Sequence, residues 1–368
     1  MSIKVLVVDD SVFFRNRICS ILRDDGRITV IGTAKNGVEA VDMADRMRPD
    51  VITMDVEMPL MDGIAALKKI MARTPCPVLM LSTLTRRSAS VTLEALESGA
   101  ADYMPKDAKV WVEDADKVRR HLTDKIVALG NKSSLKTRAS TTFQPSESVI
   151  TKAVPSGLSK SEPMVEARPK NSSVSSLRMP SCQMLAIGSS TGGPAALQKI
   201  LPLLPANLPM PVLLIQHMPK TFTSVFASRL NELCQISVKE AEDGDRLLPG
   251  HAYLAPGGAQ MILDPAAENT LKIFNSGDRV TYRPSVDLTF ASLAKAYGRR
   301  TLAIVLTGMG SDGCEGAKLL KQKGAEVWAQ DQDSCTIYGM PKAVVSANLA
   351  DHVLSLDDIG KVLQRGGR

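Results

Sequence analysis

Short apolar runs alternate with helix-patterned stretches over the first third of the chain. The apolar runs are VLVV (5–8), TVIGTA (29–34), VITM (51–54), PVLML (77–81) and ADYM (101–104). The stretches between them, such as VFFRNRICSILRD and GIAALKKIMAR, repeat apolar residues at three- and four-residue spacing, which is typical of amphipathic helices. Five strand–helix units of this size predict an α/β domain with a doubly wound parallel sheet over residues 1–125.

The same alternation resumes near the middle of the chain. The predicted strands are MLAIG (184–188), PVLLIQ (211–216), HAYLAP (251–256), AQMILD (259–264), TLAIVLTG (301–308) and EVWAQ (326–330). Helical spacing follows from Ala195 and again near residues 222–233. We expect a second doubly wound α/β domain over residues 182–368, in which HAYLAP and AQMILD form a β-hairpin.

The segment between the two domains, residues 126–181, has neither period. It is rich in Ser, Thr and Pro and nearly lacks aromatic residues, a composition typical of a flexible linker. Eight Lys and Arg against three Glu lie between Asn131 and Pro180, so this segment carries +5 of the formal net charge of +6. Basic charge concentrated on a linker argues against a recognition surface, and we expect no nucleic-acid partner.

Cysteine usage and hydropathy point to the cytoplasm. The six cysteines are scattered, with no CxxC pair and no histidine at ligand spacing, so neither a disulfide framework nor a zinc site is expected. No apolar run approaches the roughly 20 residues of a membrane span, and the opening MSIKVLVVDD turns acidic after a few apolar residues. We expect a cytoplasmic protein without membrane insertion.

Chemically reactive side chains follow the strands of the first domain. Asp9 and Asp10 follow the first strand, Asp55 ends the third, Ser82 ends the fourth and Lys106 lies just past the fifth. The carboxyl ends of parallel strands share one edge of a sheet. Three carboxylates at one edge repel one another unless a cation joins them, and hard oxygen ligands favour Mg²⁺. A lysine nearby could pair with an oxyanion attached to a carboxylate.

The stretches VVDDS, DVEMPLMDG, LST and DYMPK resemble the response-regulator receiver domain, a flavodoxin-like (βα)5 fold, over essentially all of residues 1–125. The resemblance implies that Asp55 accepts a phosphoryl group and that Asp9 and Asp10 help it to hold Mg²⁺. It further implies a phosphoryl contact from Ser82, an ion pair from Lys106 and a switching aromatic at Tyr103.

One position departs from the receiver pattern. Receiver domains usually carry a proline after the lysine, whereas here Asp107 follows Lys106 and the proline, Pro105, precedes it. The resemblance therefore does not imply the shape of the loop that directs Lys106.

The stretch AIGSSTGGP, residues 186–194, carries the first candidate chemistry of the second domain. Dinucleotide binding needs G-x-G-x-x-G, and Gly188, Gly192 and Gly193 do not have that spacing. A P-loop needs Lys followed by Ser or Thr, where Pro194 and Ala195 stand. Two interpretations stay open: a tight structural turn, or a nucleophilic serine between a strand and a helix N-terminus, whose N–H groups can stabilise an oxyanion.

A serine nucleophile needs a base, and the chain has four histidines. His121 lies in a charged helical stretch, His251 begins a predicted strand and His352 lies near the C-terminal strand, so surface or structural roles are expected for all three. His217 ends the strand PVLLIQ, and Asp312 lies in LTGMGSDG after another strand. Serine, histidine and aspartate then share one sheet edge, as a catalytic triad requires. The residues alone leave the hydrolase and the structural turn about equally supported.

Six motifs in the second domain together resemble the catalytic domain of chemotaxis protein-glutamate methylesterases, the CheB family. They are AIGSSTGGP, IQHM, VKEAEDGDRLLPGHAYLAPG, RPSVD, VLTGMGSDG and SCTIYGMPKAV. The resemblance covers about residues 184–365 and selects Ser190, which directly precedes Thr-Gly-Gly, over Ser189. It implies His217 as the base and Asp312 as its orienter. Thr191 and the backbone around Met309 lie where they could line the site.

The resemblance also implies the reaction. A serine hydrolase of this family demethylates glutamate methyl esters on the cytoplasmic region of chemoreceptors through an acyl-enzyme, releases methanol, and deamidates glutamines. It needs no cofactor for the ester chemistry, and a chemotaxis histidine kinase donates the phosphoryl group to the receiver. The alternative is a non-enzymatic response regulator whose second domain binds a nucleotide or a partner, and such a binder would not need His217 or Asp312.

Overall fold

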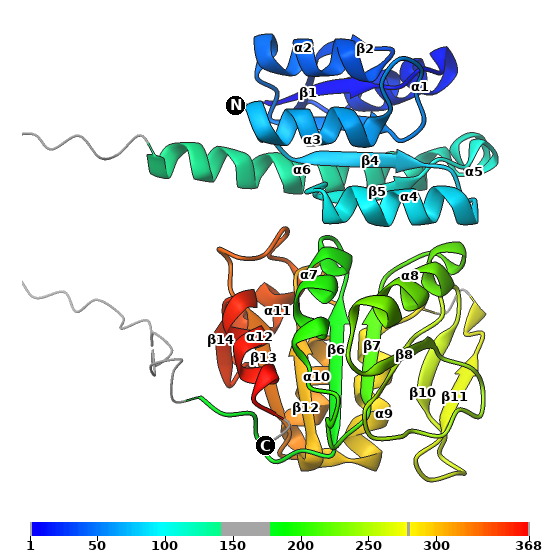
Figure 1. The fold of residues 1–368 in the computed structure, drawn as a ribbon, viewed down its shortest axis with the longest axis vertical. Helices are drawn as coiled ribbons and strands as arrows, with labels where there is room; N and C mark the ends of the chain where they lie inside the picture. Colours follow the sequence, from blue (N-terminus) through cyan, green and yellow to red (C-terminus); the bar gives the residue numbers. More distant parts are fainter. Residues whose placement is uncertain (1, 141–176, 278–279, 367–368) are drawn as a thin grey trace, which may run out of the picture.

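The computed structural model describes residues 2–140, 177–277 and 280–366 of the chain, which form two domains (Figure 1). The first is a sheet in the order β2-β1-β3-β4-β5, with every neighbouring pair parallel. Its strands are β1 (Ile3–Val8), β2 (Ile28–Ala34), β3 (Val51–Asp55), β4 (Val78–Ser82) and β5 (Asp102–Pro105). The predicted (βα)5 architecture is confirmed.

The helices of this domain are α1 (Val12–Arg23), α2 (Gly37–Met47), α3 (Gly63–Arg73), α4 (Arg86–Glu97), α5 (Ala108–Glu113) and α6 (Ala115–Ser140). Five of them begin at a polar residue whose side chain accepts a backbone N–H of the first turn: Ser11, Asn36, Asp62, Thr85 and Asp107. Such caps satisfy N–H groups that have no partner within the helix. Four of the five strand-to-helix loops have only two or three residues, and the strand ends cluster at one edge of the sheet.

The second domain is a seven-stranded parallel sheet in the order β14-β13-β12-β6-β7-β9-β8. Its strands are β6 (Met184–Ser189), β7 (Val212–Gln216), β8 (Ser237–Glu240), β9 (His251–Leu254), β12 (Thr301–Val305), β13 (Glu326–Gln330) and β14 (His352–Leu354). Its helices are α7 (Gly193–Ile200), α8 (Lys220–Leu233), α9 (Val286–Ala296), α10 (Cys314–Gln322), α11 (Met340–Ser346) and α12 (Leu356–Gln364).

Both faces of this sheet are covered by helices. Leu185 and Ile187 of β6 pack with α7, α8 and α12, whereas Met184 and Ala186 pack with α9, α10 and α11. Successive side chains of a strand alternate between faces, so one apolar strand serves two cores. This arrangement confirms the predicted doubly wound fold and leaves the strand ends as the open edge for chemistry.

The β-hairpin of this domain is present, but its predicted pairing was wrong. HAYLAP forms β9, which lies parallel between β7 and β8. AQMILD forms β10 (Gln260–Leu263), which pairs antiparallel with β11 (Leu271–Phe274). Because β7 and β8 occupy both edges of β9, β10 has no edge of β9 to join and pairs with the next segment instead.

Helix α6 continues to Ser140, past residue 126 where the linker was expected to begin. The rest of the predicted linker, up to residue 176, lies outside the described residues. No helix in the described part of the chain is long and apolar enough to cross a bilayer.

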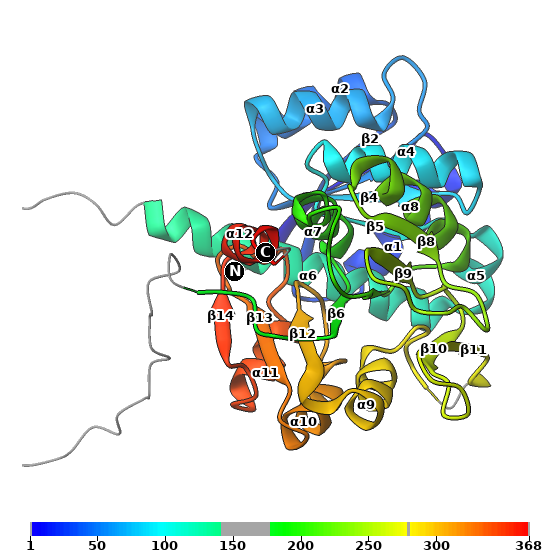
Figure 2. The same cartoon turned by 60° about the horizontal axis from the view of Figure 1, so that its bottom comes forward.

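The α4–β5 side of the first domain packs on the second domain. Figures 1 and 2 show α4 facing α7 and α8. The Tyr103 ring stacks on the Phe222 ring at a centroid distance of 4.7 Å and an interplanar angle of 15°. At the rim, the Arg229 guanidinium donates to the Glu97 carboxylate at 2.9 and 3.1 Å. The two domains therefore share an apolar interface with an ion pair at its edge.

Candidate active site

Ser190 stands directly after β6, on the turn into α7. Its N–H donates to the Thr307 carbonyl at 3.1 Å, and its own carbonyl accepts the Gly193 N–H at 2.8 Å. Gly192 has a φ of 77°, and a Cβ there would lie 2.4 Å from Thr336. Only glycine fits this left-handed position. The TGG sequence thus builds a tight turn that holds Ser190 at the N-terminal end of α7.

The two adjacent serines have different environments. Ser189 is fully buried, and its hydroxyl donates to the Gln216 side-chain carbonyl at 2.7 Å. Ser190 is half-buried and lines a cavity of about 430 Å³. A nucleophile must reach its substrate, so this difference favours Ser190.

His217 follows β7, and its backbone N–H donates to the Ser189 carbonyl at 3.1 Å, which fixes it beside the serine turn. Its Nε2 lies 2.7 Å from Oδ2 of Asp312. Its Nδ1 is buried and has no hydrogen-bond partner among the described residues. Because an ionised carboxylate only accepts hydrogen bonds, Nε2 carries the proton of the neutral ring and Nδ1 can accept one.

Asp312, in the loop after β12, is held at the N-terminus of α9. Its carboxylate accepts the Ser285 hydroxyl at 3.0 Å and the N–H groups of Val286 and Asp287 at 2.7 and 3.0 Å. Burial alone would raise the pKa of Asp312, but the hydrogen bonds from His217 and these amides outweigh it and hold the pKa below its usual value. The carboxylate therefore stays charged while it orients the imidazole.

The cavity beside Ser190 has walls from both domains. The second domain contributes Ser190, Thr191, His217, Met218, Pro219, Lys220, Gly258, Thr281, Tyr282, Arg283 and Met309. The first domain contributes Asp102, Tyr103, Pro105, Lys117, His121 and Lys125. Lys125 of α6 contacts the Asp102 carboxylate, and its Nζ donates to Oγ1 of Thr191 at 3.1 Å. A side chain of the first domain thus reaches the residue next to Ser190.

The other histidines make no hydrogen bond to Ser190, His217 or Asp312 in the described part of the chain. His121 is exposed, as expected, although it stands at the rim of the same cavity. His251 hydrogen-bonds the Pro249 carbonyl at 3.0 Å, and His352 lies 3.6 Å from Glu326. Neither of these two lines the cavity.

The first domain carries a second cluster, at the carboxyl edge of its own sheet. Oxygen atoms of Asp9, Asp10 and Asp55 lie within 4.8 Å of one another. Lys106 Nζ donates to Asp9 at 2.8 Å and to Asp55 at 2.6 Å. Burial raises the pKa of Asp55 to about 6 even though Lys106 opposes the change. Three carboxylates within one ion's reach form the oxygen donor set that suits a hard divalent cation.

Two predicted members of this cluster point elsewhere. The Ser82 hydroxyl accepts a hydrogen bond from Thr92 of α4 at 2.7 Å, and no hydrogen bond joins it to Asp55 in the described part of the chain. Tyr103 is buried in the domain interface, against Phe222. Both therefore contact α4 or the second domain and not the carboxylates.

Asp107 caps α5. Its carboxylate accepts the N–H groups of Lys109 and Val110 at 2.9 and 3.4 Å. The neighbouring Trp111 indole donates to the Pro105 carbonyl at 3.0 Å. With both sides of Lys106 held in this way, its side chain reaches Asp9 and Asp55 despite the reversed proline.

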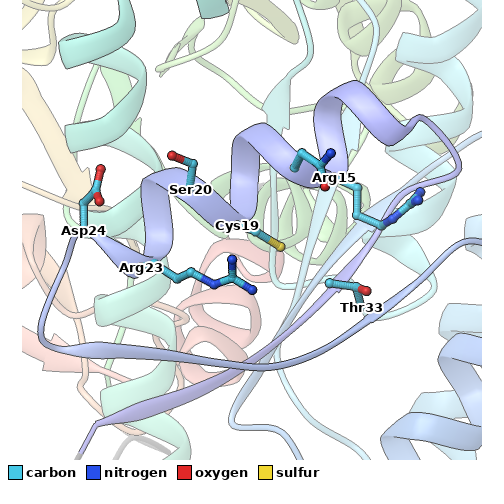
Figure 3. A pocket seen from close by; sticks show the side chains of 7 residues that line it. Arg15, Cys19, Ser20, Arg23, Asp24 and Thr33 are labelled. Carbon is cyan, nitrogen blue, oxygen red and sulfur yellow. The ribbon is translucent and has the colours of Figure 1, made fainter.

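A further cavity of about 430 Å³ lies along α1 of the first domain (Figure 3). Its lining comprises Arg15, Asn16, Cys19, Ser20, Arg23, Asp24 and Thr33. Burial raises the pKa of the Cys19 thiol, which disfavours the reactive thiolate. Arg15 donates to the carbonyls of Asp9 and Asp10. The clusters built around Ser190 and Asp55 are the better functional sites.

The groups that position the candidate triad were missed from the sequence. Gln216 donates to the Ser190 carbonyl at 3.0 Å, Ser285 and Val286 hold Asp312, and Tyr282 stacks on His217. Ser285 and Val286 belong to the RPSVD motif, which could have indicated a site contribution.

Comparison with known proteins gives matches over both domains. Residues 5–111 match the response regulator receiver domain family, and residues 185–363 match the CheB methylesterase family. The chain is 53% identical over 385 residues to protein-glutamate methylesterase/protein-glutamine glutaminase 1 of Pseudomonas aeruginosa, with 99% of each chain covered. It is 50% identical over 372 residues to the enzyme of the same name from Vibrio cholerae, with 98% of each covered.

Among solved structures, the crystal structure of the Thermotoga maritima CheB methylesterase catalytic domain is 42% identical. The match has a TM-score of 0.47 and covers 50% of this chain and 98% of that one.

Proposed function

The chain belongs to the CheB family of protein-glutamate methylesterases, and we propose that Ser190, His217 and Asp312 form the triad with which it demethylates chemoreceptors. Its function is that of a chemotaxis hydrolase regulated by a receiver domain, with both methylesterase and protein-glutamine glutaminase activity.

Ser190 Oγ attacks the side-chain carbonyl of a glutamate methyl ester while Nδ1 of His217 takes the hydroxyl proton. Asp312 stabilises the imidazolium that forms. The N–H groups of Thr191 and Gly192, which directly follow Ser190, stabilise the oxyanion in this proposal, because the Gly193 N–H already donates to the Ser190 carbonyl. The tetrahedral intermediate expels methanol, which receives the proton from His217. Water, activated by His217, then hydrolyses the acyl-enzyme to free glutamate. A glutamine amide follows the same path and releases ammonia.

The packing of the receiver supports an inhibitory role for it. Lys125 and the buried Tyr103 line the cavity that holds Ser190, so in this proposal the receiver hinders the entry of a receptor segment while the two domains stay in contact. Phosphorylation of Asp55 activates the enzyme if it stabilises the separated state more than the packed one. Tyr103 lies on β5 close to Lys106 and stacks on Phe222 of the second domain. It therefore links the Asp55 cluster to the domain interface.

Phosphorylation itself is implied by the receiver domain. Asp9, Asp10 and Asp55 would hold Mg²⁺, which neutralises charge on the incoming phosphoryl group. The Asp55 carboxylate accepts that group, and Lys106 exchanges its ion pair with Asp55 for one with the phosphoryl oxygens. Ser82 requires a rotation away from Thr92 to reach the same oxygens. No metal takes part in the ester chemistry of this proposal.

The proposed partners follow from the two sites. The esterase site takes the methylated cytoplasmic region of chemoreceptors, and the receiver takes its phosphoryl group from a chemotaxis histidine kinase. Both partners act in the cytoplasm, which is therefore the proposed location.

The proposal rests on one observation: the imidazole of His217 is bonded to Asp312 through Nε2, its buried Nδ1 has no hydrogen-bond partner among the described residues, and its backbone N–H binds the carbonyl of Ser189, the residue before Ser190. A fluorophosphonate probe tests it. Labelling should occur in the wild-type protein and in Ser189→Ala, and should be lost in Ser190→Ala. Labelling that survives Ser190→Ala but not Ser189→Ala would reject the serine assignment.

A further inference from the structure

The phenol ring of Tyr282 lies flat against the imidazole of His217. The ring centroids are 4.3 Å apart and the planes differ by 5°. We propose that Tyr282 is a positioning residue for His217, which holds the imidazole plane so that Nε2 faces Asp312 and Nδ1 faces the Ser190 turn. This inference rests on the proposed triad and adds a component to it.

The backbone around Tyr282 is fixed by one buried side chain. Gln260 of β10 is fully buried and donates from Nε2 to the Tyr282 carbonyl at 2.8 Å. Its Oε1 accepts the Ser285 N–H at 2.8 Å. Both ends of the 282–285 segment are therefore tied to the hairpin, and the ring is presented from a rigid support.

The glycine-rich turn that carries Asp312 leaves room for the tyrosine. Gly310 has a φ of 90°, and a Cβ built there would lie 2.8 Å from the Tyr282 hydroxyl oxygen. A side chain at residue 310 would push the phenol off the imidazole. The shape of the GMGSDG turn thus matches a stacked Tyr282.

The same segment also organises the edge of the imidazole. The Ser285 hydroxyl and the Val286 N–H, which follow Tyr282 closely in the chain, bind the Asp312 carboxylate that accepts from His217. Residues 282–286 therefore support both the face of the imidazole, through the Tyr282 ring, and its Nε2 edge, through Asp312. Rotation of the imidazole about its Cβ–Cγ bond would break its stacking on Tyr282.

Stacking also stabilises the charged ring. An aromatic face attracts a cation, so the imidazolium formed when Ser190 loses its proton gains more from Tyr282 than the neutral imidazole does. Such an interaction lowers the barrier without strengthening substrate binding, and its loss should reduce kcat while KM stays nearly constant.

Full-length Tyr282→Phe and Tyr282→Leu, assayed on a methylated chemoreceptor fragment with saturating acetyl phosphate, test this role. The leucine variant should lose about tenfold in kcat, the scale of an aromatic or cation–π contact, with KM changed by less than about twofold. The phenylalanine variant keeps the ring and should retain at least about half of the wild-type kcat. Tyr297→Leu removes a tyrosine that bonds Asn269, away from the cavity, and should leave kcat unchanged.

Several outcomes would overturn the inference: wild-type kcat in Tyr282→Leu, equal losses in the leucine and phenylalanine variants, or a loss confined to KM. Tyr282→Met repeats the ringless test if the leucine variant melts at a lower temperature than wild type. His217→Gln in the same assay separates this inference from the triad. An inactive His217→Gln beside a fully active Tyr282→Leu rejects only the role of Tyr282, whereas an active His217→Gln rejects the triad itself.

Discussion

Lys125 Nζ lies 3.1 Å from Thr191 Oγ1, so a receiver side chain contacts the residue that follows the candidate nucleophile. Lys125 is buried and also contacts Asp102, which neighbours Tyr103 on β5. Strand β5 runs from Asp102 to the residue before Lys106, which binds Asp55. The contacts of Lys125 with Asp102 and with Thr191 therefore connect the candidate phosphorylation site to the candidate esterase site.

Removing the Lys125 ammonium should weaken receiver inhibition. The double variant Lys125→Met/Asp102→Asn removes both buried charges together, so no unpaired charge stays in the interface. It also removes the hydrogen bond to Thr191. The unphosphorylated rate of ester hydrolysis should rise about tenfold or more, because a buried charged hydrogen bond of roughly 1.5–3 kcal/mol no longer holds the domains together. Lys321→Met, which removes a lysine paired with Asp351 on the far side of the second domain, is the control. An unchanged basal rate in the double variant would show that this contact does not inhibit.

The catalytic base is tested by comparing histidines. His217→Gln should reduce kcat by about 10⁴-fold or more, since removal of a triad base costs that much in serine hydrolases. His251→Gln and His352→Gln should keep wild-type rates. Methanol release from methylated receptor is the measurement, and near-normal turnover by His217→Gln would mean that the chemistry has another base.

Asp287 predicts a pH dependence of stability. Burial, followed by the charge of nearby Asp312, raises the pKa of Asp287 to about 6, while the N–H groups of Gly313 and Gly316 hydrogen-bond its carboxylate. A carboxyl whose folded pKa lies above its usual value binds more protons in the folded than in the unfolded chain. The folded state therefore loses stability as pH rises from about 4 to about 6.

Asp287→Asn keeps an acceptor oxygen and removes this titration. The melting temperature of the wild type should therefore fall relative to that of the variant between about pH 4 and pH 6 and stay offset above it. Calorimetry across this range gives the measurement. A constant difference between the two proteins across the range would show that Asp287 does not titrate there.

Sequence patterns located the strand ends but not the contacts between segments. Ser190, His217 and Asp312 each follow an apolar strand of a parallel sheet, and such ends share one edge, so their grouping followed from the pattern. Ser285, which binds Asp312 from 27 residues away, precedes a helix and follows no strand end. Its role depends on the packing of α9 beside β12, which no local pattern encodes.

The hairpin and the domain interface also depend on contacts between segments that the sequence pattern does not predict. Proximity along the chain favoured pairing residues 251–256 with 259–264, yet the sheet places β9 between β7 and β8. The contact of Tyr103 with Phe222 joins residues of separate domains. Apolar periodicity marks both residues as buried but cannot say that they bury each other.

The rate of methyl-ester hydrolysis with and without acetyl phosphate, in three proteins, tests the central claim most directly. They are the full-length chain, the full-length Asp55→Asn variant and a chain lacking residues 1–140, which removes α6 together with the rest of the receiver. The account predicts that acetyl phosphate accelerates only the full-length wild type. Asp55→Asn should stay near the basal rate, because its amide cannot accept the phosphoryl group. The truncated chain should exceed the unphosphorylated full-length rate, since no catalytic group is lost and the cover of the Ser190 cavity is gone. A truncated chain slower than the unphosphorylated full-length protein would contradict the account, because the receiver would then be needed for catalysis or substrate docking.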